Sequence, residues 1–487
     1  MSLGARGLYA CGALCGKLCE MPPGIRGGAM ENVMNNWSLF RAGRLMLILA
    51  AAVSLPGCSK SDSESAAAPA AASSAPKVCE GDAGIAVPAG FCATVFADNL
   101  GHARHLTVAP NGDVYVNTWS SMYTMMKNAP GGYIVALRDA DHDGRAEGIE
   151  RFGTIHQDGK PGGGTGIAVH NGALYAEVDD KLVSYALAAD SLAPKSQAQT
   201  IVSGLPQGGD HPMHPFAIAA DGALYMDSGS PSNSCQEKNR AFQSPGRKPC
   251  PELNTHAGIW RYDAAKTGQV FSPRERYATG LRNPEALAVQ PRDGALYAVV
   301  HGRDQLSENW PKLYTVEQQN ELPAEIFVRI SDGADFGWPS CYFDAMQAKQ
   351  VLAPEYGGDG GKAAGDCAMK GRPDMAFPAH WAPDALAFYS GTAFPAKYQG
   401  GAFVSFHGSW NRNPKQAGYL IAFVPFAAGK PSGTYEEFAT GFAGKEPPAD
   451  PAQAPHRPMG LAVSPDGAIY VSDDVNGRVW RIAYLGN

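Results

Sequence analysis

The chain has 487 residues, of which 44% are hydrophobic, so it is long enough to bury a large core. Its formal net charge is −7 and its pI is near 6.0, which argues against a nucleic-acid-binding face. With 57 glycines and 37 prolines the chain is rich in turns, and this composition favours an all-β fold of many short strands.

Residues 1–58 have the pattern of an export segment. Arg41 and Arg44 precede an apolar run over residues 45–57, in the order of a secretory signal. The run is shorter than the ~20 residues that a membrane-spanning helix needs, so a signal is predicted instead of a transmembrane helix. Residues 1–29 are interpreted as an upstream extension.

The apolar run ends in the tetrapeptide Leu-Pro-Gly-Cys, which resembles the lipobox of bacterial lipoproteins. The resemblance implies lipidation of Cys58, and therefore a periplasmic protein anchored to the membrane. The alternative is an ordinary secretion signal. Residues 59–78 are dominated by alanine, serine and proline, which predicts a flexible tether before a folded domain over 79–487.

Six cysteines follow the export segment, and an even number in an exported chain indicates disulfides. Six cysteines allow 15 pairings. Nearness along the chain favours three short loops, with free buried thiols as the alternative. The favoured pairs are Cys79–Cys92, Cys235–Cys250 and Cys341–Cys367.

An acidic segment over residues 139–150 matches the spacing D-x-[DN]-x-[DN]-G-x5-E of calcium-binding loops. Asp139, Asp141, Asp143 and Glu150 supply its oxygen ligands, which suit Ca²⁺. The flanking residues have the pattern of strands, whereas an EF-hand needs helices. A structural calcium site and a solvated acidic hairpin therefore both remain open.

A pair of short apolar runs around a tight turn recurs six times, and each unit has room for two further strands. Long repeats of about four strands are typical of a β-propeller. The six hairpins are expected at residues 105–116, 166–176, 216–226, 286–300, 385–406 and 460–472. Their turn glycines are Gly112, Gly172, Gly222, Gly294, Gly401 and Gly467.

The two ends of the domain over 79–487 also favour a closed ring. Residues 91–96 and 477–484 each have the pattern of a strand, and a propeller commonly closes by placing its terminal strands in one blade. We therefore predict an all-β fold, a six-bladed β-propeller with four-stranded blades. The fifth unit is irregular, and a pair of β-sandwiches is the less favoured alternative.

In a propeller, the start of each first strand and the end of each second strand lie on the same face. Polar residues at these points should therefore converge on one mouth of the central channel. His211, Arg282 and Arg457 occupy equivalent positions, 10 to 12 residues before their turn glycines. His301 to Asp304 and His407 to Arg412 follow second strands. A concave cluster of such residues is the default binding-site hypothesis.

Five segments carry a family resemblance: DHPMHPFAIAADG (210–222), RNPEALAV (282–289), ADFGWP (334–339), HGSWNR (407–412) and HRPMGLAVSPDG (456–467). Together they resemble the glucose/sorbosone dehydrogenase family, and HGSWNR looks closer to its sorbosone branch. The resemblance implies an exported six-bladed propeller that uses pyrroloquinoline quinone (PQQ) and Ca²⁺ to oxidise a sugar or sugar aldehyde.

The resemblance assigns a role to each matching residue. His211 matches the general base, Arg282 and Asn283 match a pair that contacts the quinone, and Arg457 matches a quinone-binding arginine. Where the family has a second arginine, this chain has Met459. His407 to Arg412 lies near a quinone-binding lysine of the family, and Arg412 is the expected replacement.

Calcium binding and the orientation of the base are implied in the same way. Gly302 and Arg303 match positions whose backbone carbonyls hold the Ca²⁺ ion beside the quinone. Ser230 stands where the family has a carboxylate that orients the base, which leaves Asp210 or Asp227 as substitutes.

The residue types suit this chemistry independently of any family. Histidine is well matched to accept a proton near neutral pH, and arginine binds planar carboxylates and carbonyls bidentately. The sequence has neither a strand–GxGxxG–helix motif nor a C-x-x-C-H haem motif, so an external cytochrome or quinone is expected to accept the electrons. A calcium-dependent lactonase and a non-catalytic binding propeller are the alternatives, and Arg282 could serve only to tie blades together.

Overall fold

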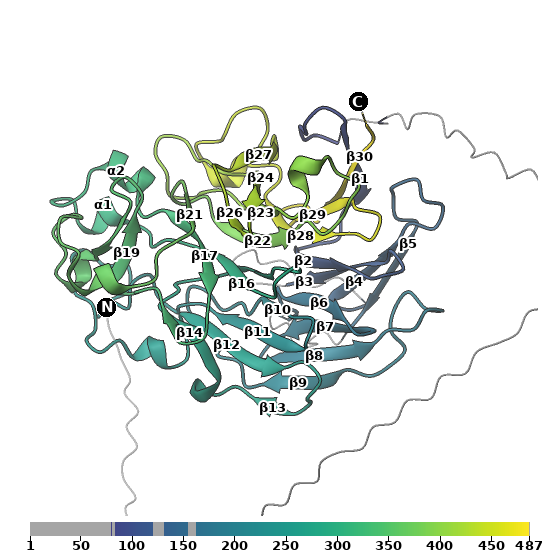
Figure 1. Ribbon diagram of the computed structural model, residues 1–487, viewed down its shortest axis with the longest axis horizontal. Helices are drawn as coiled ribbons and strands as arrows, with labels where there is room; N and C mark the ends of the chain where they lie inside the picture. The colour runs from purple at the N-terminus through teal and green to yellow at the C-terminus, as the bar shows by residue number, and fades with distance from the viewer. Residues whose placement is uncertain (1–78, 80–82, 120–130, 154–161, 487) are drawn as a thin grey trace, which may run out of the picture. The chain divides into compact units, whose positions relative to one another are not determined.

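The fold was derived from a computed structural model, which describes residues 79, 83–119, 131–153 and 162–486. Cys58, the export segment and the tether lie outside the described residues. The described chain forms six small antiparallel sheets arranged as a ring, with one strand of each sheet facing the common centre (Figure 1). The predicted six-bladed β-propeller is confirmed.

Each blade begins with its innermost strand. Blade 1 holds β2 (Ala103–Val108), β3 (Val114–Thr118), β4 (Ile134–Arg138) and β5 (Gly148–Phe152). Blade 2 holds β6 (Ile167–His170), β7 (Ala173–Val178), β8 (Lys181–Ala186), β9 (Gln199–Ser203) and β13 (Gln269–Val270). Blade 3 holds β10 (Phe216–Ile218), β11 (Ala223–Ser228), β12 (Gly258–Asp263), β14 (Arg276–Thr279) and β18 (Ala334–Asp335).

The remaining blades have four strands each. Blade 4 holds β15 (Ala286–Val289), β16 (Leu296–Val300), β17 (Glu325–Ile330) and β21 (Met375–Phe377). Blade 5 holds β22 (Pro383–Phe388), β23 (Ala402–Phe406), β24 (Leu420–Val424) and β27 (Glu436–Ala439). Blade 6 holds β28 (Pro458–Val463), β29 (Ile469–Asp473), β30 (Val479–Tyr484) and β1 (Phe91–Ala97).

Two blades depart from the predicted four strands. In blade 2 the short strand β13 pairs in parallel with β9, and in blade 3 β18 pairs in parallel with β14. Each added strand comes from a connection within the following blade, β13 from that between β12 and β14 and β18 from that between β17 and β21. Sequence periodicity does not resolve them because each is only two residues long. Two small hairpins stand outside the blades. They are β19 (Cys341–Asp344) with β20 (Lys349–Leu352), and β25 (Phe426–Ala427) with β26 (Lys430–Pro431).

The ring closes as predicted, because β1 pairs antiparallel with β30 over the register Phe91↔Tyr484 to Ala97↔Val479. The six predicted hairpins also form. At five of them the predicted glycine has a positive φ, which a residue without Cβ adopts at no steric cost. The exception is the irregular fifth unit, where Gly400 has the positive φ of 77° in place of Gly401.

The hydrophobic core is divided among the six interfaces between neighbouring blades. One cluster packs blade 6 against blade 1, for example through Phe96, Val116 and Tyr470. Equivalent clusters fill the other five interfaces. The second strands of blades 1, 3, 4, 5 and 6 are buried throughout, since a neighbouring blade covers each of their faces. This packing leaves the strand ends as the places for polar side chains.

Short helices lie in the connections, and the two α-helices lie beside β19 in Figure 1. None of the helices in the described part of the chain is long and apolar enough to span a membrane. The α-helices are α1 (Leu306–Asn309) and α2 (Val316–Glu321). The 3-10 helices are η1 (Pro251–Asn254), η2 (Pro273–Glu275), η3 (Pro354–Tyr356), η4 (Gly365–Met369), η5 (Ala396–Tyr398) and η6 (Pro451–Gln453).

All three predicted disulfides are present: Cys79–Cys92, Cys235–Cys250 and Cys341–Cys367. The second closes a loop with a sequence separation of 15, and this loop carries Arg240 to the functional site described below. The Cys235–Cys250 disulfide is therefore expected to stabilise the fold and also to restrict the loop that positions Arg240.

Replacing Cys235 and Cys250 together by serine should lower the free energy of unfolding by about 3 kcal/mol, because the unfolded chain regains the freedom of the closed loop. Equilibrium denaturant unfolding of oxidised wild type and double variant measures this difference. A Cys79→Ser/Cys92→Ser variant controls for loss of a similar loop far from the site. Equal unfolding free energies for wild type and the Cys235/Cys250 variant would contradict the prediction.

Candidate active site

A cavity of about 600 Å³ opens at the end of the propeller where first strands begin and second strands end. The two sets of residues singled out in the sequence meet here. The residues from before first strands are Asp210, His211, Arg282, Asn283 and Arg457, and Arg104 joins them from the start of β2. Those from after second strands are His301, Gly302, Asp304, His407, Gly408, Trp410 and Asn411.

His211 is held in one tautomer by the backbone. Its Nδ1–H donates to the carbonyl oxygen of Ser230 at 2.6 Å, which leaves Nε2 without a proton and able to accept one. Burial, and next the charge of Arg282, hold the pKa of His211 well below its ordinary value. The imidazole is therefore a neutral base at neutral pH.

Neither of the carboxylates expected to orient His211 contacts it. The carboxylate of Asp210 accepts from Arg240 at 2.9 Å. Asp227 is fully buried, and its two carboxylate oxygens have no hydrogen-bond partner among the described residues. Burial, and next the charge of Glu285, raise the pKa of Asp227 well above its ordinary value. The Ser230 carbonyl takes over the orienting role that sequence reasoning had sought in a side chain.

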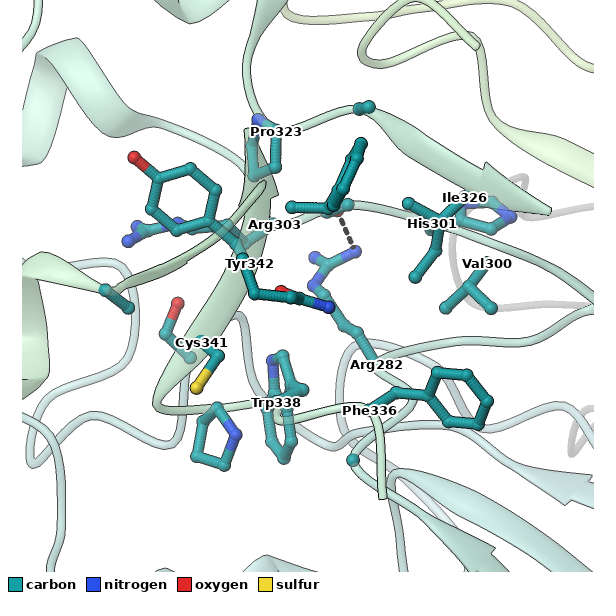
Figure 2. A pocket seen from close by; sticks show the side chains of 18 residues that line it. Arg282, Val300, His301, Arg303, Pro323, Ile326, Phe336, Trp338, Cys341 and Tyr342 are labelled. Atoms are coloured by element: carbon teal, nitrogen blue, oxygen red, sulfur yellow. Dashed lines mark hydrogen bonds between the residues drawn. The ribbon is translucent and has the colours of Figure 1, made fainter. Parts of the chain in front are cut away.

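Arg282 is buried and its guanidinium is almost fully engaged by the protein. It donates to the backbone oxygens of Asn233 and Gly302, and its Nη2 lies 2.9 Å from Asp304 Oδ2. Figure 2 shows the side chain reaching between Trp338 and His301 in a second, smaller cavity of about 50 Å³. Arg282 lines both cavities and therefore lies at the boundary between them. Its hydrogen bond to Asn233 also connects the start of blade 4 to the loop after β11.

Asp304 is the point at which several site residues meet. One carboxylate oxygen accepts from both Arg282 and Arg240, at 2.9 and 3.0 Å, and the other accepts from Asn411 at 2.9 Å. Although burial opposes ionisation, Arg282 holds the pKa of Asp304 well below its ordinary value. A charged Asp304 therefore fixes three side chains that come from blades 3, 4 and 5.

Arg457 has more of its donors free than Arg282. Its Nε donates to the carbonyl oxygen of His407 at 3.1 Å, and its Nη2 to that of Gly408 at 2.7 Å. Its Nη1 has no hydrogen-bond partner among the described residues, and the side chain is only half-buried. Asn283 is buried in the lining of the same cavity, with its amide 3.4 Å from Glu285. Arg457 is thus available to an anion.

The floor of the cavity is a network of alternating charges. Arg104 donates to Glu285 at 2.7 Å, and His301 Nε2 lies 3.1 Å from Asp384 Oδ1. Burial and the charge of Asp384 raise the pKa of Glu285 to about 7. Although burial opposes protonation, Asp384 raises the pKa of His301 to about 9. Each carboxylate of this floor is therefore matched by an arginine or an imidazole.

Gly302 and Arg303 differ in their placement. Gly302 lines the main cavity, and its carbonyl oxygen accepts one hydrogen bond from Arg282 at 2.8 Å. A carbonyl oxygen has two lone pairs, so one remains for a cation. Arg303 lines the smaller cavity instead, and its guanidinium pairs with the buried carboxylate of Glu355 at 2.6 Å.

The structure does not bring Arg412 to the cavity. Its guanidinium donates to the carbonyl oxygens of Asn320 and Ala379 and pairs with Glu321 at 2.8 Å. These contacts hold Arg412 against the end of α2. The physical reason is that three fixed acceptors satisfy the guanidinium there, whereas the preceding residues Trp410 and Asn411 line the cavity.

The acidic segment forms a hairpin between β4 and β5, far from the cavity lining. Asp139, Asp141 and Asp143 come together with Glu147, while Glu150 lies within β5 and is exposed. β5 begins at Gly148, and within it Glu150 pairs in register with Ala136 of β4. Its side chain is therefore not part of the cluster that the spacing motif predicts.

Sequence reasoning missed several cavity residues. Arg240 comes from the long loop between β11 and β12, so no strand end marks it. Asp384 and His380 precede the hairpin of the irregular fifth unit, whose residues before the first strand were not singled out in the sequence. Glu285 directly follows Arg282-Asn283-Pro284, and this position next to two predicted site residues could have identified it. The missed residues are Arg240, Glu285, Glu325, His380, Asp384 and Met213.

A protein-family model described as TrAA12-like matches residues 85–484. The chain belongs to the TrAA12-like family. A curated relative, an uncharacterized protein of Borreliella burgdorferi, is 28% identical over 212 residues. That match covers 43% of this TrAA12-like chain and 49% of the relative, so the chain spans about half of the relative's length.

Solved structures share the fold of this TrAA12-like protein. A Trichoderma reesei protein of Carbohydrate-Active Enzymes Family AA12 is 18% identical with a TM-score of 0.64, over 82% of this chain and 97% of that chain. The PQQ domain of pyranose dehydrogenase from Coprinopsis cinerea is 20% identical with a TM-score of 0.63, over the same shares.

A third structure, the soluble aldose sugar dehydrogenase from Escherichia coli, is 15% identical with a TM-score of 0.52, over 81% of this chain and 99% of that chain. The predicted resemblance to PQQ-dependent sugar dehydrogenases is thereby confirmed for the fold, whereas the assignment to the sorbosone branch stays a prediction. At these identities the likeness establishes the fold alone.

Proposed function

We propose that this protein is a PQQ-dependent dehydrogenase that oxidises a sugar or a sugar aldehyde, of the aldose or sorbosone type. The observation that carries the proposal is the pairing of a neutral, tautomer-fixed His211 with an arginine-lined cavity of about 600 Å³. The printed names of the structurally similar proteins, a pyranose dehydrogenase PQQ domain and an aldose sugar dehydrogenase, support the same activity.

The residues present fit PQQ, which is a planar tricarboxylate. Arg457 offers a guanidinium nitrogen with no partner among the described residues, and Arg282 and Asn283 are buried donors in the lining of the same cavity. Hydrogen bonds from arginine to carboxylates are among the strongest in proteins, since they are charge-assisted and bidentate. PQQ bound here supplies a two-electron acceptor for hydride.

In this proposal His211 is the general base. His211 Nε2 accepts the proton of the substrate hydroxyl while hydride leaves the adjacent carbon, and the Ser230 carbonyl keeps the imidazole pointing the same way. Arg282 stabilises negative charge that develops near it, because its position is fixed by Asp304.

A Ca²⁺ ion fits beside this cluster at the Gly302 carbonyl, which keeps one lone pair free, with the Arg303 carbonyl as the second proposed ligand. The carboxylate of Glu325 lines the same cavity and accepts a hydrogen bond from the Gly302 N–H at 2.7 Å, so it lies close to this carbonyl. For the acidic hairpin over 139–150 we propose a structural cation at most, since it lies outside the cavity lining.

Calcium-dependent lactone hydrolysis is the second candidate, because the cavity lining holds five carboxylates, those of Asp210, Glu285, Asp304, Glu325 and Asp384. Four of them are matched by an arginine or an imidazole, from Arg240, Arg104, Arg282 and His301 respectively for Asp210, Glu285, Asp304 and Asp384. Carboxylates neutralised in this way make a weaker cage for a water-activating metal, so the dehydrogenase is favoured.

The deciding experiment adds PQQ and Ca²⁺ to the purified protein and follows dye-linked oxidation of aldoses and aldehydes. The dye replaces the external cytochrome or quinone that the proposal requires as electron acceptor. We expect saturable activity that depends on PQQ. Failure to bind PQQ with Ca²⁺ present would overturn the dehydrogenase, and lactone hydrolysis by the same preparation would replace it.

Membrane attachment is a separate proposal that rests on Cys58, which lies outside the described residues. The disulfides agree with an exported protein, because such bridges persist in oxidising compartments. Cys58→Ser should move the protein from the membrane fraction to the soluble periplasmic fraction, as measured by fractionation and immunoblotting. Release of the unaltered protein, or a mature N-terminus other than Cys58, would indicate ordinary secretion.

A further inference from the structure

We propose that Trp410 is a stacking platform for the ring of a closed-ring sugar, so that the substrate class is a pyranose in preference to a small acyclic aldehyde. The inference rests on the proposed function. Trp410 lies in the loop after β23, lines the main cavity, and is 49% exposed. The other exposed large apolar side chains of the described chain do not line this cavity.

The backbone on both sides of Trp410 is held in place. The N–H of Ser409 donates to the carbonyl oxygen of Ala417 at 2.8 Å, and the Ser409 hydroxyl donates to Gln416 at 2.8 Å. On the other side, the Asn411 amide donates to Asp304 at 2.9 Å. The indole is therefore presented to solvent by a fixed loop.

The guanidinium of Arg240 lies over the Trp410 ring. Its guanidinium carbon lies 5.7 Å from the centre of the Trp410 ring, a distance at which a cation is attracted to the aromatic face. Asp210 and Asp304 bind the same guanidinium at 2.9 and 3.0 Å. Because both carboxylates are anchored in the site, Arg240 holds the ring and leaves the rest of its surface to the cavity.

The platform is tied to the base through adjacent residues. Asp210, which binds Arg240, directly precedes His211 in the chain, and Trp410 and His211 line the same cavity. A substrate with its hydroxyl at His211 Nε2 can therefore extend toward the indole. The indole is linked through Arg240 and Asp210 to the residue that precedes the base.

A contact with the Trp410 indole is expected to favour a pyranose ring over a small acyclic aldehyde. A pyranose has an apolar face of C–H groups and a polar edge, so its face can cover the indole while its edge meets Arg240 and Asn411. Covering an exposed aromatic surface with C–H groups removes apolar area from water. A three-carbon aldehyde has no comparable face and gains little from Trp410.

The test compares reconstituted holoenzymes of wild type, Trp410→Ala and Trp410→Phe on glucose and on glyceraldehyde. For Trp410→Ala we expect kcat/KM for glucose to fall about 10- to 30-fold, mainly through KM, because a partial aromatic contact is lost. For glyceraldehyde the loss should stay near about twofold. Trp410→Phe should recover most of the glucose activity, since it keeps a flat aromatic face.

Controls separate the platform from other roles. Phe242→Ala removes an aromatic ring that is 63% exposed and outside the cavity lining, and should leave both substrates unaffected. A PQQ titration of each variant should give the wild-type affinity. Equal losses on both substrates, no loss on glucose, or weakened PQQ binding by Trp410→Ala would each overturn the sugar platform; the last outcome would make the indole a cofactor contact.

A binding measurement keeps the inference testable if no sugar is oxidised. Glucose is titrated into wild type and Trp410→Phe while tryptophan fluorescence is recorded. A change confined to wild type supports the platform even though the proposed dehydrogenase has failed. The absence of that change overturns the platform independently of the activity.

Discussion

Replacing His211 by alanine should lower kcat for sugar oxidation by about 10²–10⁴, the usual contribution of a positioned general base. Binding of PQQ should remain, since the cofactor contacts are assigned to arginine and asparagine. The reason for the size of the effect is the fixed tautomer, which presents an unprotonated Nε2 to the substrate. The measurement is steady-state turnover of variant protein saturated with PQQ and Ca²⁺.

Ser230→Ala is the matched control. The group that orients His211 is the backbone carbonyl at 2.6 Å, whereas the Ser230 hydroxyl lies at 3.2 Å from the same nitrogen. Removing the hydroxyl should therefore cost about one neutral hydrogen bond, less than about tenfold in kcat. Turnover of reconstituted His211→Ala at the wild-type level would show that another group is the base.

The same assignment gives a direction for the pH dependence. A base works only when unprotonated, so activity is lost as the pH falls through the pKa of His211. Burial and the charge of Arg282 hold that pKa well below its ordinary value, which extends activity to lower pH. The acid limb of kcat/KM should therefore lie below pH ~6.5. A limb at or above that pH would contradict the assignment.

Replacing Arg457 by alanine should weaken PQQ binding roughly 10- to 150-fold, because one or more charge-assisted hydrogen bonds of about 1.5–3 kcal/mol are lost. The fold should be little affected, since Arg457 is half-buried and donates only to two backbone carbonyls of one loop. Direct titration with PQQ, together with thermal melting, measures both effects.

Arg282→Ala should behave differently, although both arginines are assigned to the cofactor. Its guanidinium forms a buried ion pair with Asp304, which would be left with Arg240 as its remaining arginine partner. Breaking a buried pair costs about 3–5 kcal/mol of stability. We therefore expect weaker PQQ binding together with a lower melting temperature. Equal melting temperatures for the two variants, or wild-type PQQ affinity in both, would contradict this map of the cavity.

The sequence by itself determined the architecture and the end of the propeller that carries the site. Turn glycines such as Gly112 and Gly467 mark each first hairpin, because few other residues adopt their backbone conformation without strain. Once the repeat is aligned, His211, Arg282 and Arg457 stand at equivalent positions, and a closed ring must bring equivalent positions together. Their meeting in one cavity follows from symmetry alone.

Only the tertiary structure decided which partner each side chain takes. The orienting acceptor of His211 is a backbone carbonyl, Arg412 is satisfied at the end of α2, and Glu147 replaces Glu150 in the acidic cluster. Arg240 enters from a loop that follows no repeat. The physical reason is that repeat spacing fixes where strands begin and end, whereas hydrogen-bond partners depend on inter-strand loops and on fixed acceptors in other blades, which periodicity does not encode.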